Sequence, residues 1–208
     1  MGKWPLPALA LVALVAAACA TSYARPDAEQ AVQPAKRCPA AWVAGYRALA
    51  RRVHAPVYCP TWLPQPLSGE IGSEFAPQAY VNRDRSYLVS FLWFEKAPSA
   101  PYEVHVNLRG YPGRTAVPMC PDTLTAAGKT VHPNVPCFAD PHGQVRVAGR
   151  TATVYTANQG IDNWHVVYAW HYHGSLYAIS QHVAPPFTFD KVLANLDRML
   201  RGLVLVKP

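Results

Sequence analysis

The amino-acid sequence predicts an α+β fold, a curved antiparallel sheet with an N-terminal and a C-terminal helix packed on it and two disulfide bonds. Three observations predict this class. Apolar residues alternate along several segments in the middle of the chain and in its C-terminal third, helical periodicity occurs at both ends of the globular part, and four cysteines are available for pairing. Half of the 208 residues are hydrophobic and only 15% are charged. That composition excludes a disordered chain and allows a packed core.

An export signal precedes the predicted domain. Residues 1–18 combine a positive charge at Lys3 with an apolar run over 6–18 that ends in small residues, the layout of a secretory signal peptide. The run is shorter than the roughly 20 apolar residues that cross a bilayer, so export is favoured over a permanent anchor helix. Residues 19–37 lack hydrophobic periodicity and predict a flexible tether, and residues 38–208 then form a single globular domain.

Cys19 indicates how the exported protein is held. The stretch Ala16-Ala17-Ala18-Cys19 resembles the bacterial lipobox, in which the cysteine becomes the first residue and carries lipid, although the lipobox prefers Leu, Val or Ile where Ala16 stands. Ordinary cleavage at Ala18-Cys19-Ala20 or Ser22-Tyr23-Ala24 is the alternative. An odd cysteine outside the cell requires an explanation, and Cys19 is left over when the other four pair. The sequence therefore predicts a bacterial extracytoplasmic protein, tethered to the membrane surface through this lipid or secreted.

The other four cysteines predict two disulfide bonds in an oxidising compartment. Four cysteines allow three pairings. The local pairing, Cys38–Cys59 and Cys120–Cys137, is favoured because each bond then closes a short loop. Metal binding by these cysteines is disfavoured, since no Cys-x-x-Cys spacing occurs.

The N-terminal part of the domain predicts a helix followed by an extended segment. Residues 40–53 have apolar residues at helical spacing, and Pro56 ends the helix. The apolar face consists of Trp42, Tyr46, Leu49 and Val53. Residues 56–66 contain four prolines, which force an extended course.

The middle of the chain predicts two strands and a long loop. Residues 87–94 are largely apolar on both alternating faces, as in a central strand that is covered on both sides. Residues 102–109 alternate between apolar and polar, which predicts one buried and one wet face. Residues 110–144 are rich in proline and predict a loop that the Cys120–Cys137 bond closes.

The C-terminal third predicts a strand and a hairpin. Residues 151–156 form the strand, and residues 164–172 and 175–183 form the hairpin around His173 and Gly174. Glycine favours the positive backbone angles of such a turn and histidine tolerates one.

A helix and a short apolar segment complete the predicted domain. Thr188 is the expected N-cap, with Phe187 and Val192 as a hydrophobic staple, and Gly202 is the expected C-terminal cap. Residues 203–206 are apolar and are expected to fold back onto the body of the domain.

Several of these elements together resemble a known family. The pattern combines an extended P-x-x-x-P-x-x-L-P stretch, a V-x-G-x-x-A hairpin, a W-x-x-x-G-x-x-Y hairpin and a terminal helix. It is carried by Pro56, Pro60, Leu63, Pro64, Val147, Gly149, Ala152, Trp170, Gly174 and Tyr177, and by the helix after Phe187. The chain is thus similar to an uncharacterised extracytoplasmic domain of Gram-positive sporulation proteins and anti-sigma factors. The resemblance implies a curved antiparallel sheet, an envelope location and no known catalysis, and no functional residue follows from it.

Histidines are the chief candidates for chemistry. A two-residue turn at His173 and Gly174 places His165 opposite His182, where Cβ atoms lie about 5 Å apart and can share a metal ion. His171 lies on the same face but about 20 Å along the strand from His165. His105, on the wet face of its strand, is the expected third ligand. The alternative is that these are polar residues on an exposed sheet face.

Two further groups are candidates for ligand binding. Arg109 and Arg114 flank a Gly/Pro turn and suit an anion. Trp164 and Trp170 belong to an aromatic series that suits a ligand groove. A solvated turn and a core face are the respective alternatives.

The sequence predicts a location more clearly than an activity. No Gly-x-Ser-x-Gly motif occurs, and the paired cysteines offer no nucleophile. The formal net charge is +7, but the basic residues are scattered and export excludes nucleic acid as the partner. The leading hypothesis is a non-catalytic envelope lipoprotein that binds an unknown envelope protein or ligand and needs no cofactor except, at most, a metal ion. The alternatives are a metal-dependent enzyme that uses the histidine-bearing face and a carrier of lipid or another ligand.

Overall fold

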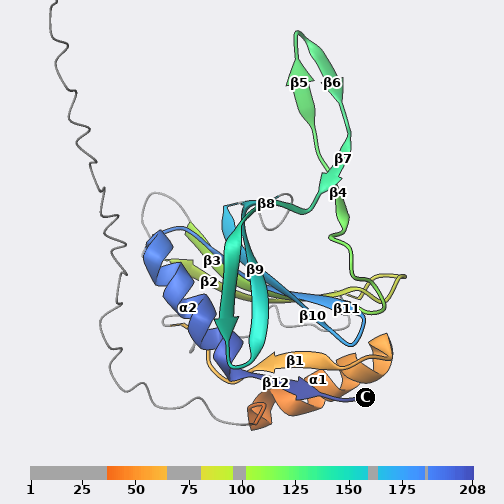
Figure 1. Cartoon of the computed structure of the whole chain (residues 1–208), viewed down its shortest axis with the longest axis vertical. Helices are drawn as coiled ribbons and strands as arrows, with labels where there is room; N and C mark the ends of the chain where they lie inside the picture. Colours follow the sequence, from red (N-terminus) through yellow and green to blue (C-terminus); the bar gives the residue numbers. More distant parts are fainter. Residues whose placement is uncertain (1–36, 65–80, 96–101, 159–163, 186) are drawn as a thin grey trace, which may run out of the picture. The chain divides into compact units, whose positions relative to one another are not determined.

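The computed structural model describes residues 37–64, 81–95, 102–158, 164–185 and 187–208 (Figure 1). All of them belong to one compact unit, Pro34–Pro208. The signal peptide, Cys19 and nearly the whole tether lie outside the described residues, so those expectations stay predictions. No helix in the described part of the chain is both long and apolar enough to cross a bilayer.

The described residues form mostly antiparallel sheet with two helices. The helices are α1 (Ala40–Val53) and α2 (Phe189–Gly202). The long strands are β2 (Tyr87–Glu95), β3 (Tyr102–Tyr111), β8 (Phe138–Val147), β9 (Arg150–Asn158), β10 (His165–Tyr172) and β11 (Ser175–His182). The short strands are β1 (Val57–Pro60), β4 (Met119–Pro121), β5 (Leu124–Ala126), β6 (Lys129–Val131), β7 (Asn134–Pro136) and β12 (Leu203–Val206).

The six long strands form one sheet in the order β2-β3-β11-β10-β9-β8. Three hairpins build it, and β3 joins the β2–β3 hairpin to β11. The predicted β10–β11 hairpin is confirmed: His173 and Gly174 have φ values of 46° and 71°, and Tyr172 lies opposite Ser175. Both positive angles match the right-handed twist of the flanking strands, so this turn sets the register of the whole hairpin.

The N-terminal helix packs against a second, two-stranded sheet. β1 pairs with β12, and α1 contacts these two strands (Figure 1). α1 therefore packs mainly on this separate two-stranded sheet and not, as predicted, on the large sheet alone; its Trp42 ring also contacts Phe91 of β2, with centroids 5.5 Å apart. The Cys38–Cys59 bond joins the start of α1 to β1, as predicted.

The C-terminal helix covers the large sheet. α2 contacts β10 and β11, and Thr188 caps its N-terminus by accepting a hydrogen bond from the Lys191 amide at 3.3 Å. The predicted glycine cap at its C-terminus is wrong, since the chain leaves Gly202 in extended conformation at Leu203 to enter β12. Arg150 instead donates to the carbonyls of Leu200 and Leu203, both at 3.0 Å. A side chain thus satisfies the carbonyls that a glycine turn would otherwise cap.

The two faces of the large sheet pack against different parts of the chain. One face packs with both helices and β1 into the main core, in which Tyr168 and Tyr177 are fully buried. The other face carries a smaller core near Phe138 and Cys137, around the Cys120–Cys137 bond. Away from this smaller core, the same face becomes polar.

Residues 110–144 form more regular structure than the predicted loop. β3 extends to Tyr111, β4 pairs with β7, β5 pairs with β6, and β8 begins at Phe138. The predicted Cys120–Cys137 bond is confirmed, and it joins β4 to the residue just after β7. Three-residue strands that contain prolines carry too little alternation to be recognised in the sequence.

Candidate metal centre

Three neighbouring strands place one histidine each in a single row. His165 of β10 lies directly opposite His182 of β11, as the hairpin register predicts. The pairing of β11 with β3 runs to Gln181 opposite Val106, and one further step places His182 beside His105. Directly opposed residues of antiparallel strands share a face. The three imidazoles therefore lie on the polar part of the sheet face that carries the smaller core.

The side chains of this histidine row (His105, His165 and His182) converge. One ring nitrogen of each lies within 4.8 Å of a ring nitrogen of both others. The ring centroids are 4.3 Å apart for His105 and His165 and 5.3 Å apart for the other two pairs. His165 is 1% exposed, His105 is 9% exposed and His182 is half-buried. The alternative that these are residues of an exposed sheet face is therefore wrong for His105 and His165.

The surrounding polar residues position His165. Its Nδ1 lies 2.9 Å from the hydroxyl oxygen of Ser180, two residues before His182 on β11. The Asn158 amide donates to the His165 carbonyl at 2.6 Å. When Nδ1–H donates to Ser180, Nε2 keeps its lone pair for a ligand, the arrangement in which a second-shell partner fixes the tautomer of a metal-binding histidine.

Ser90, Asn107 and Ser180 lie opposite one another on the same face, and all three are polar and buried. Ser90 donates to the side-chain oxygen of Asn107 at 2.5 Å, and Asn107 lies opposite Ser180. Sequence reasoning missed these supporting residues. Their signal was present, because Ser90 and Ser180 interrupt largely apolar strands and Asn107 lies on the polar side of its strand, and the three share a face once the strands are paired.

The electrostatic environment keeps His165 neutral. Burial lowers the pKa of His165 most, and the positive charges of His105, His182 and Arg109 lower it further. Together they bring the pKa from 6.5 to about 2. A metal ion binds imidazole only in its neutral form. A neutral His165 can therefore coordinate a metal ion at neutral pH without first losing a proton.

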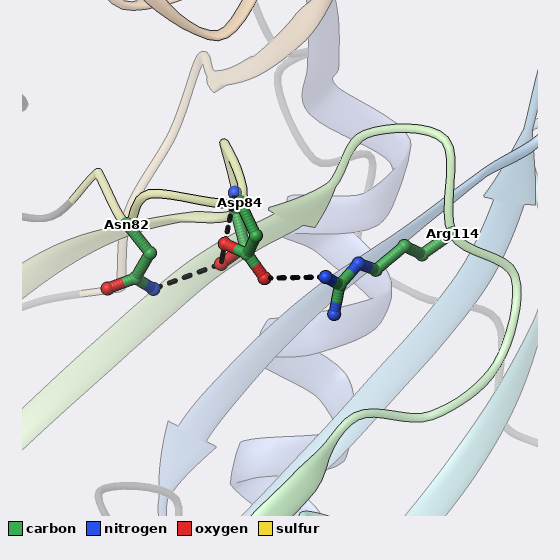
Figure 2. A network of polar contacts seen from close by, with 4 residues as sticks. Asn82, Asp84 and Arg114 are labelled. Carbon is green, nitrogen blue, oxygen red and sulfur yellow. Dashed lines mark hydrogen bonds and ion pairs between the residues drawn. The ribbon is translucent and has the colours of Figure 1, made fainter.

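The structure places Arg109 and Arg114, the candidates for anion binding, in different surroundings. Arg109 lies within β3, on the face of the histidine row, and not on the turn. Arg114 lies on the turn after β3, and its guanidinium pairs with Asp84 at 3.2 Å (Figure 2). Asp84 in turn accepts a hydrogen bond from the Ser86 hydroxyl at 2.6 Å. This hydrogen bond is the largest cause of the lowered pKa of Asp84, and the charge of Arg114 contributes.

The two tryptophan candidates occupy opposite environments. Trp170 is 2% exposed in the main core, where its ring packs edge-on against Tyr58 with centroids 5.2 Å apart, and it borders a cavity of about 640 Å³. Trp164 precedes β10, is 75% exposed and has a φ of 64°. The prediction that Trp164 belongs to the buried aromatic face is wrong. The residue instead lies in the solvent beside His165.

Comparison with known proteins gives no indication of function, so the arrangement of the described residues is the main evidence. No protein-family model, no curated protein and no solved structure matches this chain. The resemblance to the extracytoplasmic sporulation domain stays a prediction.

Proposed function

We propose that this protein binds a transition-metal ion in the bacterial cell envelope, with His105, His165 and His182 as its ligands. The observation that carries the proposal is the convergence of three imidazoles whose nitrogen atoms lie within 4.8 Å of one another. In a tetrahedral zinc site each nitrogen is about 2.1 Å from the metal, so nitrogens lie roughly 3.4 Å apart. The three imidazoles would therefore have to move closer together to bind the ion.

The ligand set favours a particular class of metal. Imidazole nitrogens suit zinc, copper and nickel, whereas calcium and magnesium require oxygen ligands. The cysteines of both disulfide bonds are oxidised and contribute no thiolate. We therefore infer a divalent ion of the zinc and copper group, bound through nitrogen atoms alone on the protein side.

The leading role is that of a non-catalytic binding module with this metal as its ligand. A metal-dependent enzyme is the second candidate, because three protein ligands leave a fourth position for water or a substrate, as in catalytic zinc sites. A lipid carrier is disfavoured. It would need an open aromatic face, yet Tyr168 and Trp170 are 1% and 2% exposed, and the Tyr168 hydroxyl donates to Asp197 of α2 at 3.0 Å.

Two disulfide bonds support an oxidising, extracytoplasmic location. Within this proposal the signal peptide directs export and a lipid on Cys19 holds the protein at the membrane. Intact mass of the natively produced protein tests the anchor. We expect a chain that begins at Cys19 with the added mass of lipid, and a mature N-terminus at Thr21 or Arg25 would contradict it.

Zinc titration tests the metal site. We expect calorimetry on the EDTA-treated and desalted protein to show stoichiometric uptake of one zinc ion. His182→Ala should abolish this uptake, because a site with two remaining histidines binds zinc far more weakly. His182 is only half-buried, so its removal should leave the fold intact, which circular dichroism and the unfolding transition will verify.

His171→Ala is the matched control. His171 lies on the same face of β10, but its Nε2 is within hydrogen-bond distance of the Thr115 carbonyl oxygen, at 2.8 Å, far from the row. This variant should bind zinc as the parent does. No uptake by the parent protein, or equal loss in both variants, would refute the metal site.

A further inference from the structure

A groove of about 460 Å³ lies between the start of α1 and the end of β12. Its lining consists of Arg37, Cys38, Val43, Arg47, Val204, Leu205, Val206 and Lys207. The side chains of Arg37, Arg47 and Lys207 are exposed, whereas the other lining residues are apolar and half-buried or buried. This basic groove thus combines three exposed cations with apolar lining residues.

The positive charge of the basic groove is not balanced locally. Neither residues 37–64 nor residues 203–208 contain any Asp or Glu, although the whole chain has 12. Among the described residues, Arg37, Arg47 and Lys207 take part in no ion pair. Arg51 is also exposed and lies one helical turn beyond Arg47. The α1–β1–β12 part of the domain is therefore strongly basic.

Helix stability does not account for the cation at the start of α1, although Arg51 in the last turn does complement the helix dipole. α1 has no acidic residue in its first turn and no side-chain N-cap. Arg37 lies at this end, where the helix dipole is positive and a further positive charge is unfavourable. The arrangement raises the local positive potential at some expense to the helix, as expected of a surface that binds an anion.

We propose that the basic groove docks onto the headgroups of anionic phospholipids. The proposal rests on the envelope anchor proposed above, because Arg37 is only 18 residues from Cys19. At about 3.5 Å per residue, a lipid on Cys19 keeps the groove within roughly 60 Å of the bilayer surface. On a protein held near the bilayer, a basic surface adds electrostatic attraction to anionic headgroups.

Vesicle cosedimentation tests the docking surface. The full-length chain with Cys19→Ala, which cannot be lipidated, is mixed with vesicles of phosphatidylcholine alone or with roughly one third phosphatidylglycerol. We expect the protein to bind the anionic vesicles more tightly than the neutral ones, and added salt should weaken this binding. Each basic residue near an anionic surface contributes about five-fold in affinity, so the triple variant Arg37→Gln/Arg47→Gln/Lys207→Gln should lose about 100-fold.

A charge-matched variant separates the groove from net charge. Arg83→Gln/Arg85→Gln/Lys129→Gln removes three exposed cations elsewhere and should keep binding to anionic vesicles. Equal loss in both triple variants, or equal binding to neutral and anionic vesicles, would overturn the proposal. Competition by millimolar inorganic phosphate at constant ionic strength would also overturn it, because the groove would then bind a small anion rather than a membrane.

Vesicle binding, zinc uptake and intact mass report separately on the docking surface, the metal site and the anchor. Zinc uptake by the groove variant should equal that of the parent, and intact mass reports on the lipid separately. Failure of vesicle binding with normal zinc uptake therefore rejects the docking surface alone, whereas loss of zinc uptake by His182→Ala says nothing against it.

Discussion

The metal-free protein is expected to lose unfolding free energy as the pH falls below 6.5, because His165 is buried in its neutral form. Its folded-state pKa is about 2 against 6.5 in the unfolded chain. Between these values the unfolded state binds one more proton, so stability is fully present above pH 6.5 and is lost towards pH 2. Each pH unit in this window costs about 1.4 kcal/mol. At pH 4.5 the expected loss is therefore roughly 2.5 kcal/mol.

Urea denaturation at several pH values, with EDTA present, measures this effect. His165→Gln cannot take up the proton, so its unfolding free energy should fall less steeply with acid, whatever its stability at pH 7.5. His142→Gln is the control, since His142 is exposed on β8. Within the part of the chain that the structure describes, the charged groups that act on His165 are His105, His182 and Arg109, and all three stay in both variants. Parallel pH profiles for His165→Gln and the parent would show that His165 is not the responsible group.

Gly110→Ala is expected to destabilise the fold by about 3 kcal/mol, at the upper end of the cost of overpacking a core. Gly110 lies opposite Tyr87 on one side and opposite Tyr177 on the other. A Cβ atom at Gly110 would lie 2.2 Å from Cε1 of the Tyr87 ring. Tyr87 is 2% exposed and cannot move aside without displacing other core residues. The glycine is thus required for space, since its own φ is not positive.

Unfolding free energies in a double-mutant cycle test this explanation. Tyr87→Leu removes the ring, so Gly110→Ala should cost much less in that background than alone. Gly128→Ala is the comparison variant, because nothing lies within 4 Å of its added Cβ and only its φ of 74° is strained. Its expected cost is about 1 kcal/mol. Equal costs of Gly110→Ala in both backgrounds would show that steric conflict with Tyr87 is not the cause.

The histidine pair could be predicted because its cause is local. His173 and Gly174 specify a two-residue turn, and a fixed turn sets the register of the strands on either side. His165 and His182 then face each other by counting. His105 could only be guessed as a third ligand, because its place depends on β3 pairing with β11, a contact between segments about 70 residues apart.

The other differences from the predictions had non-local and local causes. α1 was recognised from its periodicity, but the small sheet on which it mainly packs arises from the pairing of β1 with β12, at opposite ends of the domain. Trp164 continues the alternation of β10, yet its positive φ turns the chain just before the strand begins. Arg114 was assigned to a turn, but its partner Asp84 comes from the turn before β2 (Figure 2).

The sequence by itself determined the two helices and the β10–β11 hairpin with its register, and it favoured the disulfide pairing that the structure shows, because each depends on residues that lie close together in the chain. Only the tertiary structure decided which face of each strand is buried, that three histidines meet and that β1 and β12 form a separate sheet. Burial and strand pairing between distant segments depend on all the packing partners at once. The candidate metal centre is assembled from three such strands, so it became visible only when they were placed side by side.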